Sequence, residues 1–189
     1  MKKLTKGLIL VLCAAILVAG SVMGTLAWLT AQDTITNTFT VGNISITLTE
    51  TTGDTYKLVP GVQVEKDPTV TVKAGSEDCY LFVKVENGIA AIEDSGNSIA
   101  NQMAANHWVA LTGVENVYYY NGLVDAGATE QKLPLFANYT VKNDVDDLST
   151  YDDAEIVITA YALQATAVGE TIDADKALAA WTANFGTNP

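Results

Sequence analysis

Alternating apolar and polar residues dominate the chain beyond its first thirty residues, and this period of two predicts β-strands. Ile44, Ile46 and Leu48 alternate with polar residues, and Val70 and Val72 do so further along. The more continuous apolar run at 79–85 is typical of a buried strand. Further strands are predicted at 117–120, 123–124, 133–141 and 155–165.

Turn residues separate these segments and predict where the chain reverses. Pro60-Gly61 and the Ala-Gly-Ser sequence at 74–76 punctuate the early strands. Asn121-Gly122 lies between two of the predicted strands, and this dipeptide best tolerates the positive φ of a two-residue hairpin turn. We therefore expect a β-hairpin at Asn121-Gly122.

Two short segments, 99–108 and 173–181, have helical spacing instead. Their apolar positions are Ile99, Met103 and Trp108 in the first and Ala177, Leu178 and Trp181 in the second. Asp173 or Thr171 is a suitable N-cap for the second helix. The first is expected to cross one end of the sheet.

Seven or more short strands separated by turns predict an all-β domain. The expected architecture is a single β-sandwich of jelly-roll or immunoglobulin-like type, with one or two short helices. It occupies residues 37–189, without an internal repeat or a domain-scale linker.

The first thirty residues have the layout of a helical secretory signal peptide. Three lysines precede the apolar run 8–19. Thr25 and Ala27 are the small residues at positions −3 and −1 relative to a cleavage site after Ala27. The alternative is a transmembrane anchor, because no charge interrupts residues 7–29 and about 20 apolar residues suffice to span. Small residues in the second half favour cleavage, so we expect residues 1–27 to be removed and the protein to be secreted.

Cleavage would remove Cys13 and leave Cys79 as the one cysteine. An intramolecular disulfide is then impossible, and stability must come from packing. Because Cys79 begins a strongly apolar segment, we expect it to be a small core residue and not a reactive thiol.

The charge balance argues against a nucleic-acid partner. The chain of 189 residues has 10 lysines, no arginine and 22 acidic residues. Without the three leader lysines the balance is 7 against 22, a formal net charge of −15. Phosphate backbones repel such a chain. Disorder is not expected either, because 49% of the residues are hydrophobic.

Enzyme chemistry finds little support in the residue types present. His107 is the only histidine, whereas a catalytic zinc site uses three protein ligands that usually include several histidines. His107 is also far from any nucleophile-elbow pattern, so a packed or surface histidine is expected. No phosphate loop or dinucleotide fingerprint occurs, and no cofactor is expected.

The densest chemical feature is an acidic segment late in the chain. Its carboxylates are Asp144, Asp146, Asp147, Asp152, Asp153 and Glu155. Ca²⁺ favours several oxygen ligands, so a calcium site is one hypothesis. The spacing does not match an EF-hand loop, and a solvated acidic loop is the alternative that we favour.

Three consecutive tyrosines, Tyr118, Tyr119 and Tyr120, resemble a carbohydrate-binding platform. Alternation places Tyr119 on one side of a strand and the other two on the opposite side. Core packing and cross-strand pairing account for such a pattern without a ligand, and we favour that explanation.

Several patches of the chain resemble one known family. Residues 24–30 (GTLAWLT), running into 36–43 (TNTFTVGN), are similar to the N-terminus of the TasA/camelysin (CalY)-like family. Members are Gram-positive secreted proteins processed by a dedicated SipW-type signal peptidase. Further similar patches are LVPG at 58–61, KDPTV at 66–70, YALQ at 161–164 and Ala180-Trp181.

The resemblance implies a jelly-roll subunit of extracellular biofilm-matrix fibres. Such subunits assemble by donor-strand exchange, in which the N-terminal segment of one copy completes the sheet of the next. The donor here would be residues 28–36, with Trp28, Leu29, Ala31 and Ile35 as its apolar side chains. Expected partners are further copies of the chain or related matrix subunits. The alternative is that 28–36 folds back as an ordinary edge strand or stays a loose tail.

The same resemblance carries a second implication, because camelysin is catalogued as a metallo-endopeptidase. The single histidine does not support that activity, and we expect a non-enzymatic structural protein or fibre accessory. Two alternatives stay open: a secreted metallopeptidase and a monomeric cell-surface adhesin or binding module.

Overall fold

A computed structural model of the chain describes residues 43–52, 57–165 and 171–186. All of them belong to the second of two units into which the chain divides, Met1–Thr40 and Val41–Pro189. No helix among these residues is long and apolar enough to cross a membrane. The predicted leader and donor segment, with Thr25, Ala27, Trp28, Leu29, Ala31 and Ile35, lie outside the described residues.

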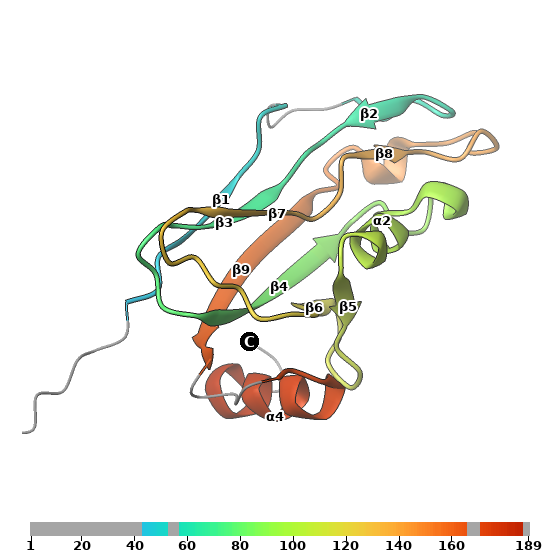
Figure 1. Cartoon of the computed structure of the whole chain (residues 1–189). Helices are drawn as coiled ribbons and strands as arrows, with labels where there is room; N and C mark the ends of the chain where they lie inside the picture. The colour runs from blue at the N-terminus through green and yellow to red at the C-terminus, as the bar shows by residue number, and fades with distance from the viewer. Residues whose placement is uncertain (1–42, 53–56, 166–170, 187–189) are drawn as a thin grey trace, which may run out of the picture. The chain divides into compact units, whose positions relative to one another are not determined.

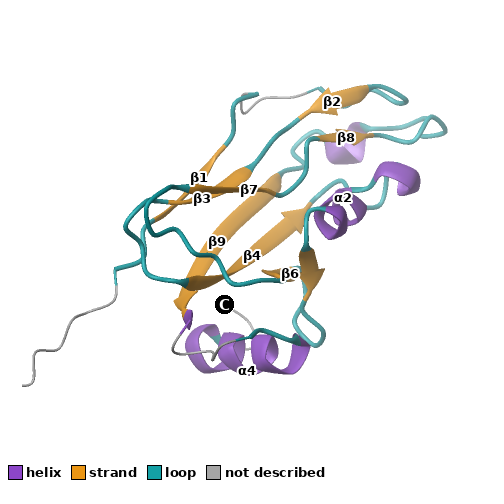
Figure 2. Cartoon of the chain, in the orientation of Figure 1, coloured by secondary structure: helices purple, strands orange, loops and turns teal. Residues whose placement is uncertain are grey.

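The described residues form three antiparallel sheets (Figures 1 and 2). The first has the order β1 (Ile46–Thr49), β3 (Thr69–Val72), β7 (Gln131–Pro134). The second pairs β2 (Gln63–Glu65) with β8 (Asn138–Thr140). The third has the order β5 (Trp108–Ala110), β6 (Val117–Tyr120), β4 (Cys79–Asn87), β9 (Ile156–Gln164).

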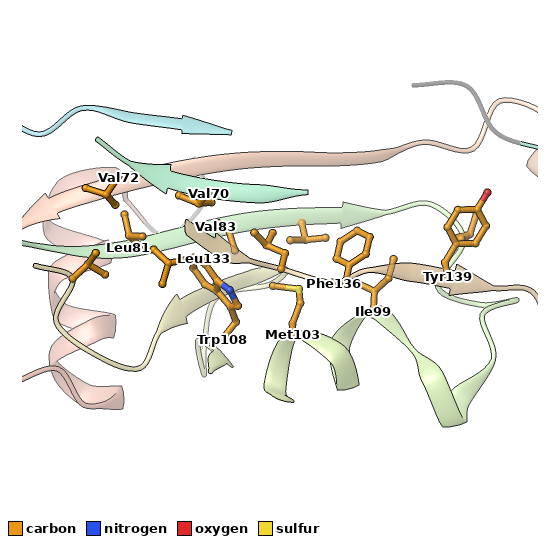
Figure 3. Packing of buried hydrophobic residues seen from close by; sticks show 14 of the residues in the cluster. Val70, Val72, Leu81, Val83, Ile99, Met103, Trp108, Leu133, Phe136 and Tyr139 are labelled. Carbon is orange, nitrogen blue, oxygen red and sulfur yellow. The ribbon is translucent and has the colours of Figure 1, made fainter. Parts of the chain in front are cut away.

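The main core lies between the sheet that contains β3 and the sheet that contains β4. Figure 3 shows Val70 and Val72 of β3 above Leu81 and Val83 of β4. Helix α2 (Ile99–Ala105) adds Met103 to the same cluster. Alternate side chains of each strand face inward because successive residues of a strand point to opposite faces. The mostly-β architecture is therefore compatible with the predicted β-sandwich.

Helix α4 (Ala174–Phe185) covers the other face of the four-stranded sheet (Figure 1). The rings of Phe82 and Trp181 have centroids 5.6 Å apart, and those of Tyr161 and Trp181 are 5.1 Å apart. Both faces of β4 are thus buried, one by a sheet and the other by a helix. This double burial explains why the segment from Cys79 is almost continuously apolar.

The helix boundaries follow from capping residues. Asp173 is the N-cap of α4, and its carboxylate accepts a hydrogen bond of 2.8 Å from the Lys176 N–H. The helix ends at Gly186, whose φ is 80°. The predicted helix at 173–181 is confirmed and extends to Phe185.

The other predicted helix, 99–108, is shorter than expected. Ser98 caps α2, and its hydroxyl accepts from the Asn101 N–H at 3.2 Å. The helix ends at Ala105, and His107 follows with a φ of 67°. A left-handed residue cannot continue the helix, so Trp108 begins β5 instead of closing α2.

The predicted hairpin at Asn121-Gly122 is wrong. Neither residue has a positive φ, which the expected turn requires. Tyr119 pairs with Phe82 of β4, and Val124 forms a bridge with Cys79 of the same strand. The chain therefore continues along β4 after β6, and Asn121-Gly122 forms a bulge within that run.

The predicted strand at 133–141 is in fact two strands that belong to different sheets. Leu133 of β7 pairs with Val70, whereas Tyr139 of β8 pairs with Val64 of β2. The buried Leu135 and Phe136 form the corner between them. A continuous apolar pattern does not reveal such a corner, because both strands face the same core. The short strands β2 and β5 are not predicted by the sequence.

A buried carboxylate joins α2 to the sheet. Glu93 is 6% exposed, and its Oε1 accepts a 2.6 Å hydrogen bond from the Ile99 N–H at the start of α2. Its Oε2 accepts from the Asn87 side chain at 3.2 Å. Burial raises the pKa of the Glu93 carboxyl, and these two hydrogen bonds oppose the rise.

We expect Trp181→Ala to destabilise the protein by about 3 kcal/mol, the lower end for a large buried side chain. The lower end applies because the buried indole N–H has no hydrogen-bond partner among the described residues, so its removal relieves a cost. Thr182→Ala, at an exposed neighbouring position, should change stability by less than about 0.5 kcal/mol. Urea unfolding measures both. Equal effects would show that α4 is not docked through Trp181.

Glu93 should make stability depend on pH. A folded-state pKa above the ordinary value means that the folded protein holds the proton more tightly, so this contribution is present at low pH and is lost as pH rises. The free energy of unfolding of the wild type minus that of Glu93→Gln should increase as pH falls from 7 towards 4.5. Denaturation series at several pH values measure this difference. A flat or falling difference would contradict the buried carboxylate.

Candidate functional site: an open strand edge and its groove

Strand β9 forms an edge of the four-stranded sheet. It pairs with β4 over its whole length, and no strand among the described residues pairs with its other side. Strand β1 is likewise an edge of its own sheet, since within the described part of the chain it pairs with β3 alone. Strands β1 and β9 lie in contact, and two cavities lie beside these edges at the start of β9. We call these two cavities the groove.

The hydrogen bonds at the two ends of β9 show which backbone groups point outward. The Ala165 N–H donates to the Asp78 carbonyl at 2.8 Å, and the Gly88 N–H donates to the Glu155 carbonyl at 2.9 Å. Hydrogen-bonded pairs alternate along an antiparallel ladder, so the odd-numbered residues of β9 bond to β4. The outward N–H and C=O groups therefore belong to Ile156, Ile158, Ala160, Ala162 and Gln164.

Of these even-numbered residues, Ile156 and Ile158 line the groove. Ile156, Ile158, Ala160 and Ala162 pack against the main core yet are only partly buried. Where β1 ends and β9 begins, Leu48 and Ile158 line a cavity of about 250 Å³. A strand placed along β9 would find backbone partners on one side and apolar side chains beneath it.

A larger cavity of about 790 Å³ lies at the start of β9. Its apolar walls include Ile89, Tyr139, Leu148, Tyr151 and Ile156. Val59 and Val157, which also line it, are 43% and 42% exposed. Together with Leu48 of the smaller cavity, 37% exposed, they leave an apolar rim around this end of the groove. Such a rim is typical of an interaction surface.

An ion pair lies where the two cavities meet. The Lys66 ammonium lies 2.7 Å from the Glu50 carboxylate, and both residues line both cavities. Next to it, the carboxylate of Asp67 accepts hydrogen bonds from Thr51 and Thr52, which lowers its pKa. The ion pair and these hydrogen bonds fix the position of the chain where it leaves β1, beside the groove.

The Lys66–Glu50 pair should contribute a measurable coupling energy. The two side chains are 10% and 23% exposed, so a single change leaves a mostly buried charge without this partner. Lys66→Met and Glu50→Gln should each cost about 1–3 kcal/mol, and the double variant should cost less than their sum by at least about 0.5 kcal/mol. Chemical denaturation of the four proteins completes the cycle. Strict additivity would show that the pair is not formed.

The structure separates the six acidic residues of the calcium hypothesis. Asp152, Asp153 and Glu155 line the larger cavity, whereas Asp144, Asp146 and Asp147 are not among its lining residues. All six are exposed. The carboxylate of Asp147 accepts from the Ser149 N–H at 2.9 Å, close to the 3₁₀ turn η2 (Ser149–Tyr151), and this bond lowers its pKa.

No group of three or more His, Cys, Asp or Glu side chains in 43–52, 57–165 and 171–186 is placed to hold a metal ion. The six acidic side chains face solvent in this structure. The calcium hypothesis stays a prediction that a melting curve with millimolar CaCl₂ tests.

The remaining candidate residues have structural roles. Cys79 is fully buried, and burial together with the Asp78 charge raises its thiol pKa to about 11. His107 is exposed at the end of α2. Both predictions are confirmed.

The three tyrosines divide as the alternation predicted. Tyr119 packs in the cluster beneath α4, whereas Tyr118 and Tyr120 pack against the main core. The ring of Tyr120 meets that of Trp108 edge-on at 5.4 Å. They support the sheet on both faces and do not form a binding platform.

Comparisons with protein-family models, with curated proteins and with solved structures find no match to this chain. Sequence reasoning did not find the groove or the Lys66–Glu50 pair, because the pairing partners of a strand are not visible in its own pattern. The length of the apolar segment 155–165 was the one available signal.

Proposed function

We propose that the protein is a secreted structural subunit of extracellular biofilm-matrix fibres, assembled by strand exchange. The N-terminal segment of one copy adds to the free edge of β9 in the next. The observation that supports this function most directly is the row of outward backbone groups on Ile158, Ala160 and Ala162, next to the groove that Ile156 and Ile158 line. The resemblance to the TasA/camelysin-like family supports the same function, and with it a jelly-roll sandwich.

Strand addition satisfies the exposed backbone and gives specificity through side-chain pockets. Five outward residues of β9 offer ten hydrogen-bonding groups, worth roughly 0.5–1.5 kcal/mol each. Ordering a nine-residue donor costs about 1–2 kcal/mol per residue. The two terms are of similar size, so burial of the donor's apolar side chains in the groove decides whether the contact is stable.

The donor in this proposal is residues 28–36, exposed when a dedicated signal peptidase cleaves after Ala27. This segment has one charged residue, Asp33, so it approaches an acidic neighbour with little repulsion. A contact between different surfaces of identical copies does not close on itself and gives an open filament. The proposed protein is non-enzymatic, and its partners are further copies or related matrix subunits.

Substitutions on the two faces of the donor test this function. Ile35→Asp places a charge on the apolar face, and Thr34→Asp places the same charge on the opposite face. Each variant is expressed as the full chain, collected after secretion and processing, and examined by electron microscopy. We expect the wild type and Thr34→Asp to form filaments and Ile35→Asp to remain as single particles, because a buried unpaired carboxylate is costly.

Single particles of the wild type at high concentration would contradict the proposed function and favour a monomeric adhesin. Filaments of Ile35→Asp with wild-type length would show that assembly uses another surface. N-terminal sequencing of the secreted protein checks that all variants begin at the same residue.

A further inference from the structure

The described chain before β1 begins close to one end of β9. The Glu77 N–H donates to the Asn43 carbonyl at 3.0 Å, and the Gln164 amide donates to the Glu77 carboxylate at 2.9 Å. Asn43 is the first described residue, so the N-terminal segment emerges near Gln164, where β9 ends. The 790 Å³ cavity lies at the opposite end, beside Ile156.

The N-terminal segment has an apolar face that is longer than the nine-residue donor. Leu29, Ala31, Ile35, Phe39 and Val41 all occupy odd positions, so in an extended strand they point to one side. Asp33 and Asn37 interrupt this stripe. Phe39 is the largest residue of this stripe. It follows the nine-residue donor in the sequence and is therefore closer to the donor's own domain.

We propose that the larger cavity receives Phe39 of the donating copy and that the donor runs antiparallel to β9. This inference rests on the proposed function and specifies the orientation of the same contact. With Ile35 opposite Ile158, an antiparallel register places Phe39 opposite Ala154, a residue of the cavity wall. The same register places Leu29 opposite Gln164 at the far end of β9.

The chemistry of the cavity matches an aromatic side chain. Ile89, Leu148 and Tyr151 provide apolar walls. The charged residues of the lining are the Lys66–Glu50 ion pair, Lys57 and the exposed Asp152, Asp153 and Glu155. A phenyl ring that packs on the apolar walls has no polar group of its own to leave unpaired. A parallel donor with Ile35 opposite Ile158 would instead place Phe39 opposite Ala162, which does not line the cavity.

The orientation also follows from head-to-tail assembly. Consider copies that all point in one direction along the filament. The donor then leaves its own domain beside Gln164, at the end of β9, and reaches the neighbouring copy beside Ile156, at the start of that copy's β9. The residues closest to the donor's own domain, including Phe39, then meet the cavity first. Every contact in the filament repeats this arrangement, so the filament has one polarity.

Disulfide crosslinking tests the orientation. In the proposed register Thr36 lies opposite Val157, on the face away from the core, at a pair that shares no hydrogen bonds. Such pairs have Cα atoms about 4.5 Å apart, within disulfide range. Thr30 lies six residues further along, roughly 20 Å away. The full chain is expressed with Val157→Cys plus Thr36→Cys, or with Val157→Cys plus Thr30→Cys as the matched control.

We expect a ladder of covalent oligomers on a non-reducing gel from the Thr36→Cys pair and none from the Thr30→Cys pair. A ladder from the control alone would mean that the donor binds in a different register or in the parallel direction, which overturns the inference and retains the proposed function. An internal disulfide in a monomer would mean that the segment folds back on its own domain, which overturns both. Filaments without either crosslink overturn the inference only.

Phe39→Ala tests the occupant of the cavity. It should raise the protein concentration needed for assembly roughly 10- to 100-fold, whereas Thr38→Ala on the opposite face should leave it within about twofold. Light scattering against concentration measures both, and thermal melts check that each variant is folded. Equal values for the two variants would overturn the assignment of Phe39, while filament formation by the wild type would still support the proposed function.

Discussion

The nine-residue ladder between β4 and β9 is the interaction on which the rest of the structure depends. Side chains on one face of these two strands pack in the main core, and side chains on the other face pack in the cluster around Trp181. Because β4 is enclosed by β6 and β9 within its sheet, no further strand can be added to it. The ladder therefore makes β9 both a structural element and the exposed edge of the sheet.

A long free edge is a hazard that proteins normally avoid with short strands, charges or covering segments. The opposite edge, β5, follows that rule with three residues. Strand β9 does not, since its even-numbered positions from Ile156 to Ala162 are apolar and its outward backbone has no partner among the described residues. The proposed donor explains this exception, because a strand from a neighbouring copy would cover the edge and the groove together.

The sequence predicts the strands better than it predicts their pairing. Capping by Asp173 and the buried strand from Cys79 are local features, and both are found. Asn121-Gly122 is an exception, because its preference for a hairpin is overridden by pairing of Val124 with β4. The groove depends on contacts between residues about a hundred positions apart, such as Leu48 and Ile158, and no local pattern contains them.

Residue-resolved hydrogen exchange of β9 in single particles and in filaments tests the central claim most directly. The amides of Thr159 and Tyr161 bond to β4 and should be protected in both states. The amides of Ile158, Ala160 and Ala162 point outward and should gain protection only in the filament. Protection of these three amides in single particles, or fast exchange in filaments, would contradict the account.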